Sequence, residues 1–417
     1  MGQGGCVIIV DGYSTGNLLA PEFRKLGMVP LHVQTTPEIW PLLQLTYKKE
    51  DYDHHFAFQG DLARLASELA PCTPTAVLPG TETGVELADQ LGEALGCPTN
   101  GIRFSEARRN KFLMIEAVGH AGLKVARQTR AHDAKELVTW VKAQGLRKIV
   151  VKPLKSAGTD SVATCFTEDE IRAACERILG RPNQLGLLNE EVLAQEFLEG
   201  TEYALDIVSR DGVDCFSAIW RYHKKAIPGN HFVFDRDELV PCDDETGQIL
   251  CEYARKVLKA LAITIGPSHA EVMLTPDGPA LVEIGTRLNG VLNPALCERC
   301  VGFGQLDLTI DCYTNPDRFH QKAATPYKLK EHAASVFLLS DRVGVVRSVP
   351  GEKRIAGLDS YSSMRLRAKP GYQLKPTIDF YTHPGWVTLI HPQAETLEED
   401  RHTIRMLETT GGMYELE

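Results

Sequence analysis

The stretch SHAEVMLTPDGPALVEIGTRLNG, residues 268–290, decides the fold of this chain. It contains two apolar runs, AEVML and ALVEI, separated by a Pro-Asp-Gly turn at residues 276–278. The pattern predicts a β-hairpin that sets the carboxylates of Glu271 and Glu283 side by side. Two close carboxylates either share a proton or bind a cation, and Mg2+ typically takes one or two of them together with phosphate and water. On this stretch alone, a magnesium site and a solvated hairpin with scattered charges remain alternatives.

A second stretch, KIVVKPLKSAGTDSV at residues 148–162, joins an apolar strand to a loop of small residues. Lys152 lies at the end of the strand, and small side chains and hydroxyl groups follow at residues 156–161. Such a loop lets backbone N–H groups and hydroxyls approach phosphate oxygens closely. The loop is not a Walker A motif, because the chain contains no GxxxxGK[ST] pattern. The stretch is consistent with a phosphate-binding loop of another type.

Two further stretches complete an ordered series along the chain. Residues 107–125, ARRNKFLMIEAVGHAGLKV, predict a helix with Lys111 near its start. QEFLEGTEY at residues 195–203 joins two strands through a glycine turn, and Glu202 leads the second strand. In this order and spacing, the helix-borne lysine, the VVKP strand, the QEFLEGTEY turn and the paired carboxylates resemble the ATP-grasp superfamily. Within it, the chain looks most like the ATP-dependent L-amino-acid ligases, which are dipeptide synthases related to antibiotic biosynthesis.

The resemblance covers residues 7–311. Its similarity to the dipeptide ligases rests mainly on Arg287, four residues after the second paired carboxylate, and on a C-terminal extension beyond the ATP-grasp core. It implies that two lysines hold the phosphates of ATP under the small-residue loop, that the QEFL segment receives adenine, and that Glu202 binds the ribose hydroxyls. The implied ATP-binding residues are Lys111, Lys152, Ser156, Ala157, Gly158, Gln195, Phe197, Leu198 and Glu202.

The same resemblance implies a metal site. Glu271 and Glu283 match the ligands of Mg2+, with Mn2+ as an alternative metal. Arg287 matches the catalytic arginine that contacts the carboxylate substrate or its acyl phosphate. Many ATP-grasp enzymes carry Asn two residues after the second Glu as a third metal ligand, whereas this chain has Gly285. Either two protein carboxylates suffice, or Asn289, which we also expect to bind substrate, contributes instead.

Other candidate contacts come from position in the chain. Glu82 begins a predicted helix after an apolar strand, so it either faces the ammonium group of a substrate or is only an acidic first-turn residue favoured by the helix dipole. Residues 216–241 contain a cluster of basic and aromatic side chains, which is either a solvated basic run or a set of contacts to substrate or phosphate. Within it we select Lys224 as a catalytic candidate beside Lys152, and His231 as a substrate contact.

Composition limits the class of protein. With 417 residues, 24% of them charged, and a net charge of -10, the chain is typical of a soluble protein of two or three domains and not of a nucleic-acid or membrane binder. No long uncharged apolar run predicts a transmembrane helix, and the N-terminus lacks the pattern of a cleavable signal. Eleven cysteines without regular spacing indicate reduced thiols, hence a cytoplasmic location, and one CxxC, Cys297 and Cys300, is weak evidence for zinc. We expect amino acids as substrates and a homodimer.

The order of predicted elements indicates the fold class. Strands and helices alternate in the first hundred residues, which predicts a parallel sheet whose ligands lie beyond the carboxyl ends of the strands. We therefore expect an α/β protein with the ATP-grasp fold. Its expected parts are an N-terminal parallel α/β domain at residues 1–110, a lid subdomain at 111–197, a central antiparallel-sheet subdomain with the metal site at 198–330, and a small β-rich C-terminal subdomain at 331–417.

Three hypotheses of function follow. The first is an ATP- and Mg2+-dependent carboxylate–amine ligase that joins two L-amino acids, or an amino acid and a related carboxylate, through an acyl phosphate. The second is an ATP-grasp carboxylase or purine-pathway ligase that activates bicarbonate or formate. The third is a non-catalytic nucleotide-binding regulator. The intact series of lysines and carboxylates favours catalysis, and Arg287 favours the first hypothesis.

Overall fold

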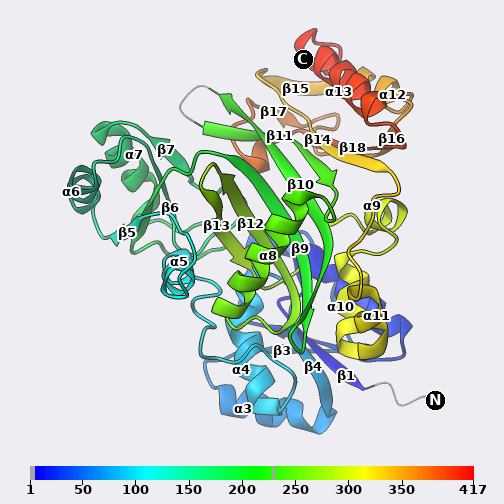
Figure 1. The fold of residues 1–417 in the computed structure, drawn as a ribbon. Coiled ribbons are helices and arrows are strands. Elements are labelled where there is room, and N and C mark those ends of the chain that lie inside the picture. The colour runs from blue at the N-terminus through cyan, green and yellow to red at the C-terminus, as the bar shows by residue number, and fades with distance from the viewer. Residues whose placement is uncertain (1–4, 228–230) are drawn as a thin grey trace.

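The computed structural model describes residues 5–227 and 231–417, apart from the side chains of Leu42 and His231. Figure 1 shows the N-terminal unit in blue at one end, the green strands of the central sheet in the middle, and the C-terminal elements in orange and red at the other end. A smaller sheet with its helices lies to one side of the central sheet. The α/β architecture predicted from the sequence is confirmed. Among the described residues, no helix is long and apolar enough to cross a membrane.

The N-terminal unit is a four-stranded sheet of order β3-β2-β1-β4, parallel throughout as predicted. Its strands are β1 (Cys6–Val10), β2 (Val29–Gln34), β3 (His54–Ala57) and β4 (Pro74–Pro79). Its α-helices are α1 (Leu19–Lys25), α2 (Pro41–Gln44), α3 (Leu62–Leu69) and α4 (Val85–Leu95), with 3-10 turns at Ser14–Leu18, Lys49–Asp51, Ala70–Cys72 and Glu82–Gly84. The loops that follow β1 and β4 pack together, because any side chain at Gly16 would collide with the backbone of Gly80.

A four-stranded antiparallel sheet of order β5-β8-β6-β7 falls within the range expected for the lid. Its strands are β5 (Gln128–Ala131), β6 (Ile149–Pro153), β7 (Ala163–Cys165) and β8 (Val192–Glu196). Two helices, α6 (Ala134–Gln144) and α7 (Glu168–Ile178), cover one face of this sheet with a shared apolar core. Each starts where the sequence provides a side-chain cap, Asp133 for α6 and Thr167 for α7. The helix α5 (Lys111–His120) precedes this sheet and begins at the cap residue Asn110.

The central sheet has eight strands in the order β13-β12-β9-β10-β11-β14-β18-β16. Its first five members are β9 (Thr201–Arg210), β10 (Val213–Ile227), β11 (His231–Val240), β12 (Ile265–Thr275) and β13 (Gly278–Gly285). The hairpin predicted at residues 268–290 is formed by β12 and β13 and is confirmed. The amphipathic helix α8 (Glu245–Ala260) packs its apolar side, including Leu250 and Val257, against this sheet.

The C-terminal segment continues the central sheet, which the sequence did not predict. The strands β14 (His332–Phe337), β18 (Gly385–His391) and β16 (Tyr361–Leu366) extend it through the pairing of β14 with β11. This pairing satisfies the backbone groups that β11 would otherwise leave at an open edge. A separate small sheet contains β15 (Gly344–Ser348), β17 (Gln373–Leu374) and β19 (Glu415–Leu416). The remaining helices are α9 (Pro294–Cys300), α10 (Gln305–Thr314), α11 (Pro316–Ala323), α12 (Pro350–Ile355) and α13 (Ala394–Thr409), with a 3-10 turn at Phe380–Thr382.

Candidate active site

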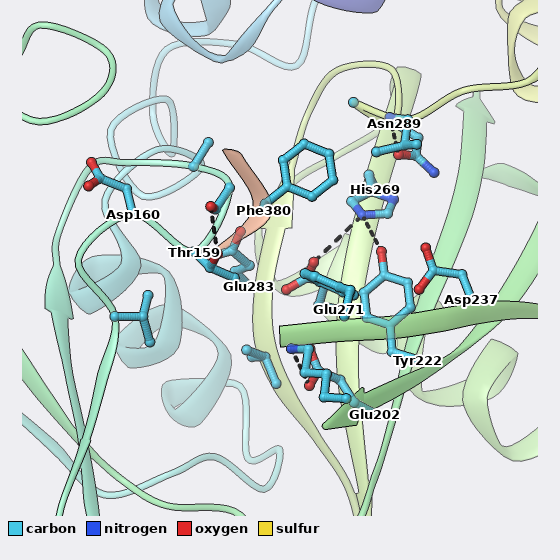
Figure 2. Close-up of a pocket in the computed structure, with 18 of the residues that line it drawn as sticks. Thr159, Asp160, Glu202, Tyr222, Asp237, His269, Glu271, Glu283, Asn289 and Phe380 are labelled. Carbon is cyan, nitrogen blue, oxygen red and sulfur yellow. Dashed lines mark hydrogen bonds and ion pairs between the residues drawn. The ribbon is translucent and has the colours of Figure 1, made fainter. Parts of the chain in front are cut away.

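A cavity of about 1530 Å3 is lined by residues from the N-terminal unit, the sheet β5-β8-β6-β7, the central sheet and the C-terminal segment. Every site residue selected from the sequence lines it except His231, whose backbone starts β11 but whose side chain lies outside the described part of the chain. The lining therefore includes Glu82, Lys111, Lys152, Ser156, Ala157, Gly158, Gln195, Phe197, Leu198, Glu202, Lys224, Glu271, Glu283, Arg287 and Asn289. The sequence separates these residues by up to two hundred positions, and the fold brings them to one place. Figure 2 shows part of this wall.

The two predicted metal carboxylates lie directly opposite each other on the hairpin. Glu271 of β12 pairs with Glu283 of β13, and the register shifts immediately after this pair. Opposed residues of an antiparallel pair project from the same face, so both carboxylates point into the cavity. Lys111 places its Nζ 3.0 Å from Oε2 of Glu283 and donates a 2.6 Å hydrogen bond to the carbonyl of Ser156. Lys111 thus links the hairpin of β12 and β13 to the start of the predicted phosphate-binding loop at residues 156–161.

His269 lies beside Glu271 and links it to a second carboxylate, that of Asp206. Nε2 of His269 lies 3.8 Å from Oε1 of Glu271, and Nδ1 lies 2.7 Å from Oδ1 of Asp206. Burial disfavours a charged imidazole, but the contacts with Asp206 and Glu271 together outweigh it and raise the pKa of His269 to about 9. Burial would raise the pKa of Glu271, whereas its bond to His269 and the charge of Lys224 lower that pKa to about 2. At neutral pH His269 is therefore an imidazolium beside a carboxylate and not a free base.

Sequence reasoning missed Asp206. It lies in β9 four residues after Glu202, so both side chains are on the same face of the strand. In the neighbouring β12 it pairs with His269. Besides His269, its carboxylate accepts hydrogen bonds from Nε1 of Trp220 at 2.9 Å and Nδ2 of Asn289 at 3.1 Å. The alternation of Glu202 and Asp206 was visible in the sequence, but the partners of Asp206 come from three other segments.

The donor set fits Mg2+. Two opposed carboxylates on one face repel each other, and the lysine and the histidine each compensate one of them from the side. In the described part of the chain, no group of three or more His, Cys, Asp or Glu side chains is arranged around one point. Two carboxylates with the other ligands from phosphate and water is the arrangement that Mg2+ commonly takes. Glu271 and Glu283 would hold the ion, which supplies positive charge to phosphoryl oxygens when bound.

The residues predicted to bind phosphate are the buried Lys152 and the loop after it, in which two residues have positive φ. Lys152 is buried at the end of β6, and burial together with the nearby Lys111 lowers the pKa of Lys152 to about 8, against the pull of Glu283. In the loop that follows, Gly158 and Thr159 have φ of 71° and 59°. Positive φ at a non-glycine residue is uncommon and clusters where a backbone must present its N–H groups in a fixed direction. This geometry suits phosphate oxygens.

The hinge expected to receive adenine is built by β8 and the turn after it. The backbone N–H of Phe197 donates to the carbonyl of Lys148 at 3.3 Å, and Nζ of Lys148 lies 3.4 Å from the centre of the Phe197 ring. The side chain of Gln195 donates to Gln128 of β5 at 3.1 Å. These contacts fix the hinge to the neighbouring elements of the same sheet and leave an apolar ring and an aliphatic residue, Leu198, on the cavity wall.

Glu202 and Lys224, which the sequence assigned to separate roles, form one pair. Nζ of Lys224 lies 2.8 and 2.7 Å from the two carboxylate oxygens of Glu202. Burial raises the pKa of Glu202 while Lys224 opposes that rise. A lysine held by both oxygens of a carboxylate is suited to orienting that carboxylate, so the geometry favours a positioning role for Lys224. The ribose role of Glu202 stays a prediction.

Glu82 is held between two guanidinium groups. Oε1 lies 2.7 Å from Nη1 of Arg109, and Oε2 lies 2.8 Å from Nε of Arg287. Burial opposes ionisation, but Arg287 and Arg109 outweigh it and lower the pKa of Glu82 to about 2. With both oxygens occupied, Glu82 fixes Arg287 and is poorly placed to bind a substrate ammonium, for which the sequence had suggested it. Arg109, two residues before Lys111, was not selected from the sequence because its partner is distant.

The space of the usual third metal ligand is occupied by this pair. A Cβ added to Gly285 would lie 2.9 Å from Oε2 of Glu82 and 3.1 Å from Cζ of Arg287. A side chain at position 285 would therefore displace Arg287 or Glu82. The guanidinium of Arg287 lies beside the position at which the resemblance noted above implies an Asn in many members of that superfamily.

The metal carboxylates can be tested by one substitution. Glu283→Gln keeps the size of the side chain and removes a charged metal ligand, which should cost about 3 kcal/mol of transition-state stabilisation, or roughly a hundredfold in turnover. ATP turnover at saturating Mg2+ is the measurement, with Glu68→Gln, an exposed carboxylate on α3, as the control. Turnover of Glu283→Gln close to that of the wild type would contradict the metal assignment.

The pairing of Glu82 has a signature in acid. Because its folded pKa of about 2 lies below the ordinary 4.5, Glu82 contributes stability above pH 4.5 that is lost as the pH falls towards 2. The difference in unfolding free energy between wild type and Glu82→Gln should therefore shrink across this window, from at most about 3 kcal/mol. Urea unfolding at pH 7, 4.5 and 3 measures it. A difference that is constant with pH would show that the two arginines do not stabilise the charged carboxyl.

The contact at Gly285 predicts a coupled effect. Gly285→Asn should fold, because the glycine is not in the left-handed region, but should displace Arg287 and reduce carboxylate-dependent ADP formation roughly tenfold or more. In an Arg287→Lys background the same change should cost much less, because the displaced group is already altered. Equal losses in the two backgrounds would mean that position 285 acts independently of Arg287.

Comparison with known proteins agrees with this geometry. Residues 147–295 match the family described as the ATP-grasp domain. Dapdiamide A synthase of Enterobacter agglomerans is 34% identical over 408 residues, a match that covers 96% of this chain and 95% of that protein.

Two solved structures share the fold. The L-amino acid ligase of Bacillus licheniformis superposes with a TM-score of 0.74 at 16% identity over 97% of each chain. The N5-carboxyaminoimidazole ribonucleotide synthetase of Thermotoga maritima gives a TM-score of 0.67 at 17% identity over 96% of this chain and 98% of that one. The motif series, the opposed carboxylates and the full-length relative together establish that this chain belongs to the ATP-grasp family of ATP- and Mg2+-dependent carboxylate–amine ligases that includes dapdiamide A synthase.

Proposed function

We propose that this ligase joins two L-amino acids, or an amino acid and a related carboxylate, to give an amide or dipeptide. The observation that carries the proposal is the fixed guanidinium of Arg287. It is held by Glu82 on one side, donates to the carbonyl of Leu288 at 3.0 Å, and lies on the same cavity wall as Glu283. A planar guanidinium is matched to a carboxylate or acyl phosphate. The full-length likeness to dapdiamide A synthase supports the same class of product.

The chemistry explains why these residues are needed. A carboxylate and an amine do not condense in neutral water, because hydroxide is a poor leaving group. Transfer of the γ-phosphoryl group of ATP to the carboxylate gives an acyl phosphate, and the amine then displaces phosphate. Lys111, Lys152 and Arg287 would offset the charge on the phosphoryl oxygens during the transfer. Each is buried in the free protein, so little reorganisation is needed when the charge develops.

The acyl phosphate must also be protected from water. The phosphate loop meets the C-terminal segment, because a Cβ added to Gly158 would lie 2.6 Å from the hydroxyl of Tyr381. Phe380 packs beside Phe234 and Phe337 at 6.3 and 6.1 Å between ring centres. Aromatic side chains of β11, β14 and the 3-10 turn at Phe380–Thr382 thus cover the cavity, which supports a reaction that excludes water. No nucleophilic side chain of the protein is required.

The alternatives differ in substrate. A carboxylase or purine-pathway ligase would activate bicarbonate or formate, and these small anions give no reason for a cavity of this size beside Arg287. A nucleotide-binding regulator would not require opposed metal carboxylates with individual cationic partners. Phosphate release should be measured with ATP, Mg2+ and the twenty amino acids, singly and in pairs, and with bicarbonate. Release that needs two amino acids supports the proposal; release with bicarbonate alone, or none at all, contradicts it.

Arg287 gives a more specific test. Arg287→Lys keeps the charge and loses the fork, so ATP binding should be normal while amino-acid-dependent ADP formation falls about a hundredfold. Arg109→Lys is the matched control, because Arg109 binds the other oxygen of Glu82 but does not line the cavity. Its loss of amino-acid-dependent ADP formation should be smaller than that of Arg287→Lys. Unchanged kinetics for the carboxylate substrate in Arg287→Lys would make the residue structural and remove the main support for an amino-acid ligase.

We also propose a cytoplasmic location and a homodimer. The cysteines of the described chain are all free, which fits a reducing compartment. Cys297 and Cys300 lie buried in the apolar core beside α9, which supports a packing role for this CxxC in place of zinc binding. Sedimentation equilibrium at micromolar concentration tests the dimer, and a monomer under those conditions would contradict it.

A further inference from the structure

The cavity continues past the metal carboxylates along one row of the central sheet. Successive cross-strand pairs join one residue on each of six adjacent strands. Because opposed residues share a face, their side chains form a single polar line on the cavity wall. In order from β9 to β16 the row is Glu202, Tyr222, Asp237, Ser335, Thr388 and Ser363.

Asp237, in the middle of this row, is a buried carboxylate without a partner. It is 9% exposed, and its Oδ1 has no hydrogen-bond partner among the described residues. An unpaired buried charge is costly, so proteins rarely keep one without a use. Burial raises the pKa of Asp237 well above its usual range, and the negative charges of Glu271 and Glu202 add to that effect while Lys224 opposes it. The raised pKa means that the free protein favours the neutral carboxyl of Asp237, and a cation bound beside it would favour the charged form.

The neighbouring cations are already committed to other carboxylates. Lys224 has its ammonium on both oxygens of Glu202. His269 donates to Asp206 and faces Glu271, and Tyr222 places its hydroxyl 3.4 Å from Nε2 of the same histidine. Figure 2 shows Asp237 beside Tyr222 and His269, on the far side of Glu271 from Glu283. Among the described residues, these neighbouring cations are therefore not paired with Asp237, which leaves the place beside it for a cationic group of a ligand.

The position of Asp237 limits what that charge can be. It lines the same cavity as Glu271, which would hold the metal ion, and Arg287, which would contact the activated carboxylate, and it is reached through that cavity. A group that binds here stands beside the acyl carbon. The second reactant of the ligase is an amine, which is an ammonium ion in neutral water and needs a carboxylate to hold it in a buried site.

We propose that Asp237 binds the ammonium group of the amine-donating substrate and, with the hydroxyl row of Ser335, Thr388 and Ser363, forms the subsite of that substrate. This inference rests on the proposed function. A row of aromatic rings runs alongside, with Phe234 in contact with Phe337 at 5.5 Å and Phe337 near Trp386 at 6.5 Å between ring centres. The C-terminal strands therefore supply the wall of the amine subsite, while the hairpin and the lid supply the ATP and metal sites.

The test separates the two halves of the reaction. Hydroxylamine, a neutral nucleophile, traps an acyl phosphate as a hydroxamate and needs no ammonium anchor. With the amino-acid pair that gives the fastest phosphate release in the wild type, Asp237→Asn should raise the KM for the amine substrate roughly ten- to a hundredfold. The KM for the carboxylate substrate and the rate of hydroxamate formation should stay within about twofold. Glu238→Gln, the next residue on β11, removes the same charge from a side chain that pairs with His223 instead of facing the cavity, and should change neither.

Thermal unfolding supplies a second readout. If Asp237 is unpaired in the free enzyme, Asp237→Asn should leave the melting temperature equal or raise it, whereas loss of a structural ion pair would lower it. Asp237→Ala provides the same kinetic comparison with both oxygens removed. Three results for Asp237→Asn would overturn the assignment. They are an unchanged KM for the amine, a loss of hydroxamate formation as large as the loss of amide formation, and a changed dependence on Mg2+ with no change in the KM for the amine. Absence of hydroxamate with the wild type would overturn the ligase function and this inference with it.

Discussion

The structure depends on two carboxylates held face to face on one hairpin at the wall of the cavity. The pairing of Glu271 with Glu283 across the hairpin brings like charges together, and that repulsion has to be offset by groups from elsewhere in the chain. Lys111 comes from the first turn of α5, and His269 is itself charged because Asp206 stands behind it. The order of elements in the fold therefore follows from the need to surround one hairpin with cations, leaving a place for a metal ion between them.

A second constraint is the space beside Gly285, which the side chain of Arg287 occupies. Arg287 reaches the site because position 285 has no side chain, and it keeps its direction because Glu82 from the N-terminal unit holds it. Among the N-terminal residues that line the cavity, Glu82 is the one that holds Arg287, and its other oxygen lies beside Arg109. In the function proposed above, position 285 leaves room for the guanidinium of Arg287, and the metal would be held by two carboxylates.

Much of the fold could be predicted from the sequence because the decisive signals are local. The Pro-Asp-Gly turn between apolar runs gave the hairpin, and the alternating strands and helices gave the parallel sheet. Lys111 and Lys152 could be selected because each stands at a fixed place relative to a strand or helix end. Pairings between distant segments could not be predicted: Lys224 with Glu202, Glu82 with Arg109, and the attachment of β14 to β11 all depend on which strands become neighbours. A single sequence shows how apolar and polar residues alternate within each strand, but it does not show the order of the strands in a sheet.

The continuous central sheet has a consequence for how such an enzyme can be altered. Because β14, β18 and β16 belong to the same sheet as β9 and β12, which carry Glu202 and Glu271, the sites proposed for the two reactants lie on one continuous sheet. The segment from β14 to residue 417 cannot be removed as a module, since its removal would expose the edge of β11 to other chains. Its inward-facing side chains, however, lie strands away from the metal hairpin. Exchange of those side chains between related ligases is therefore a route to new amide products that leaves the phosphoryl-transfer machinery intact.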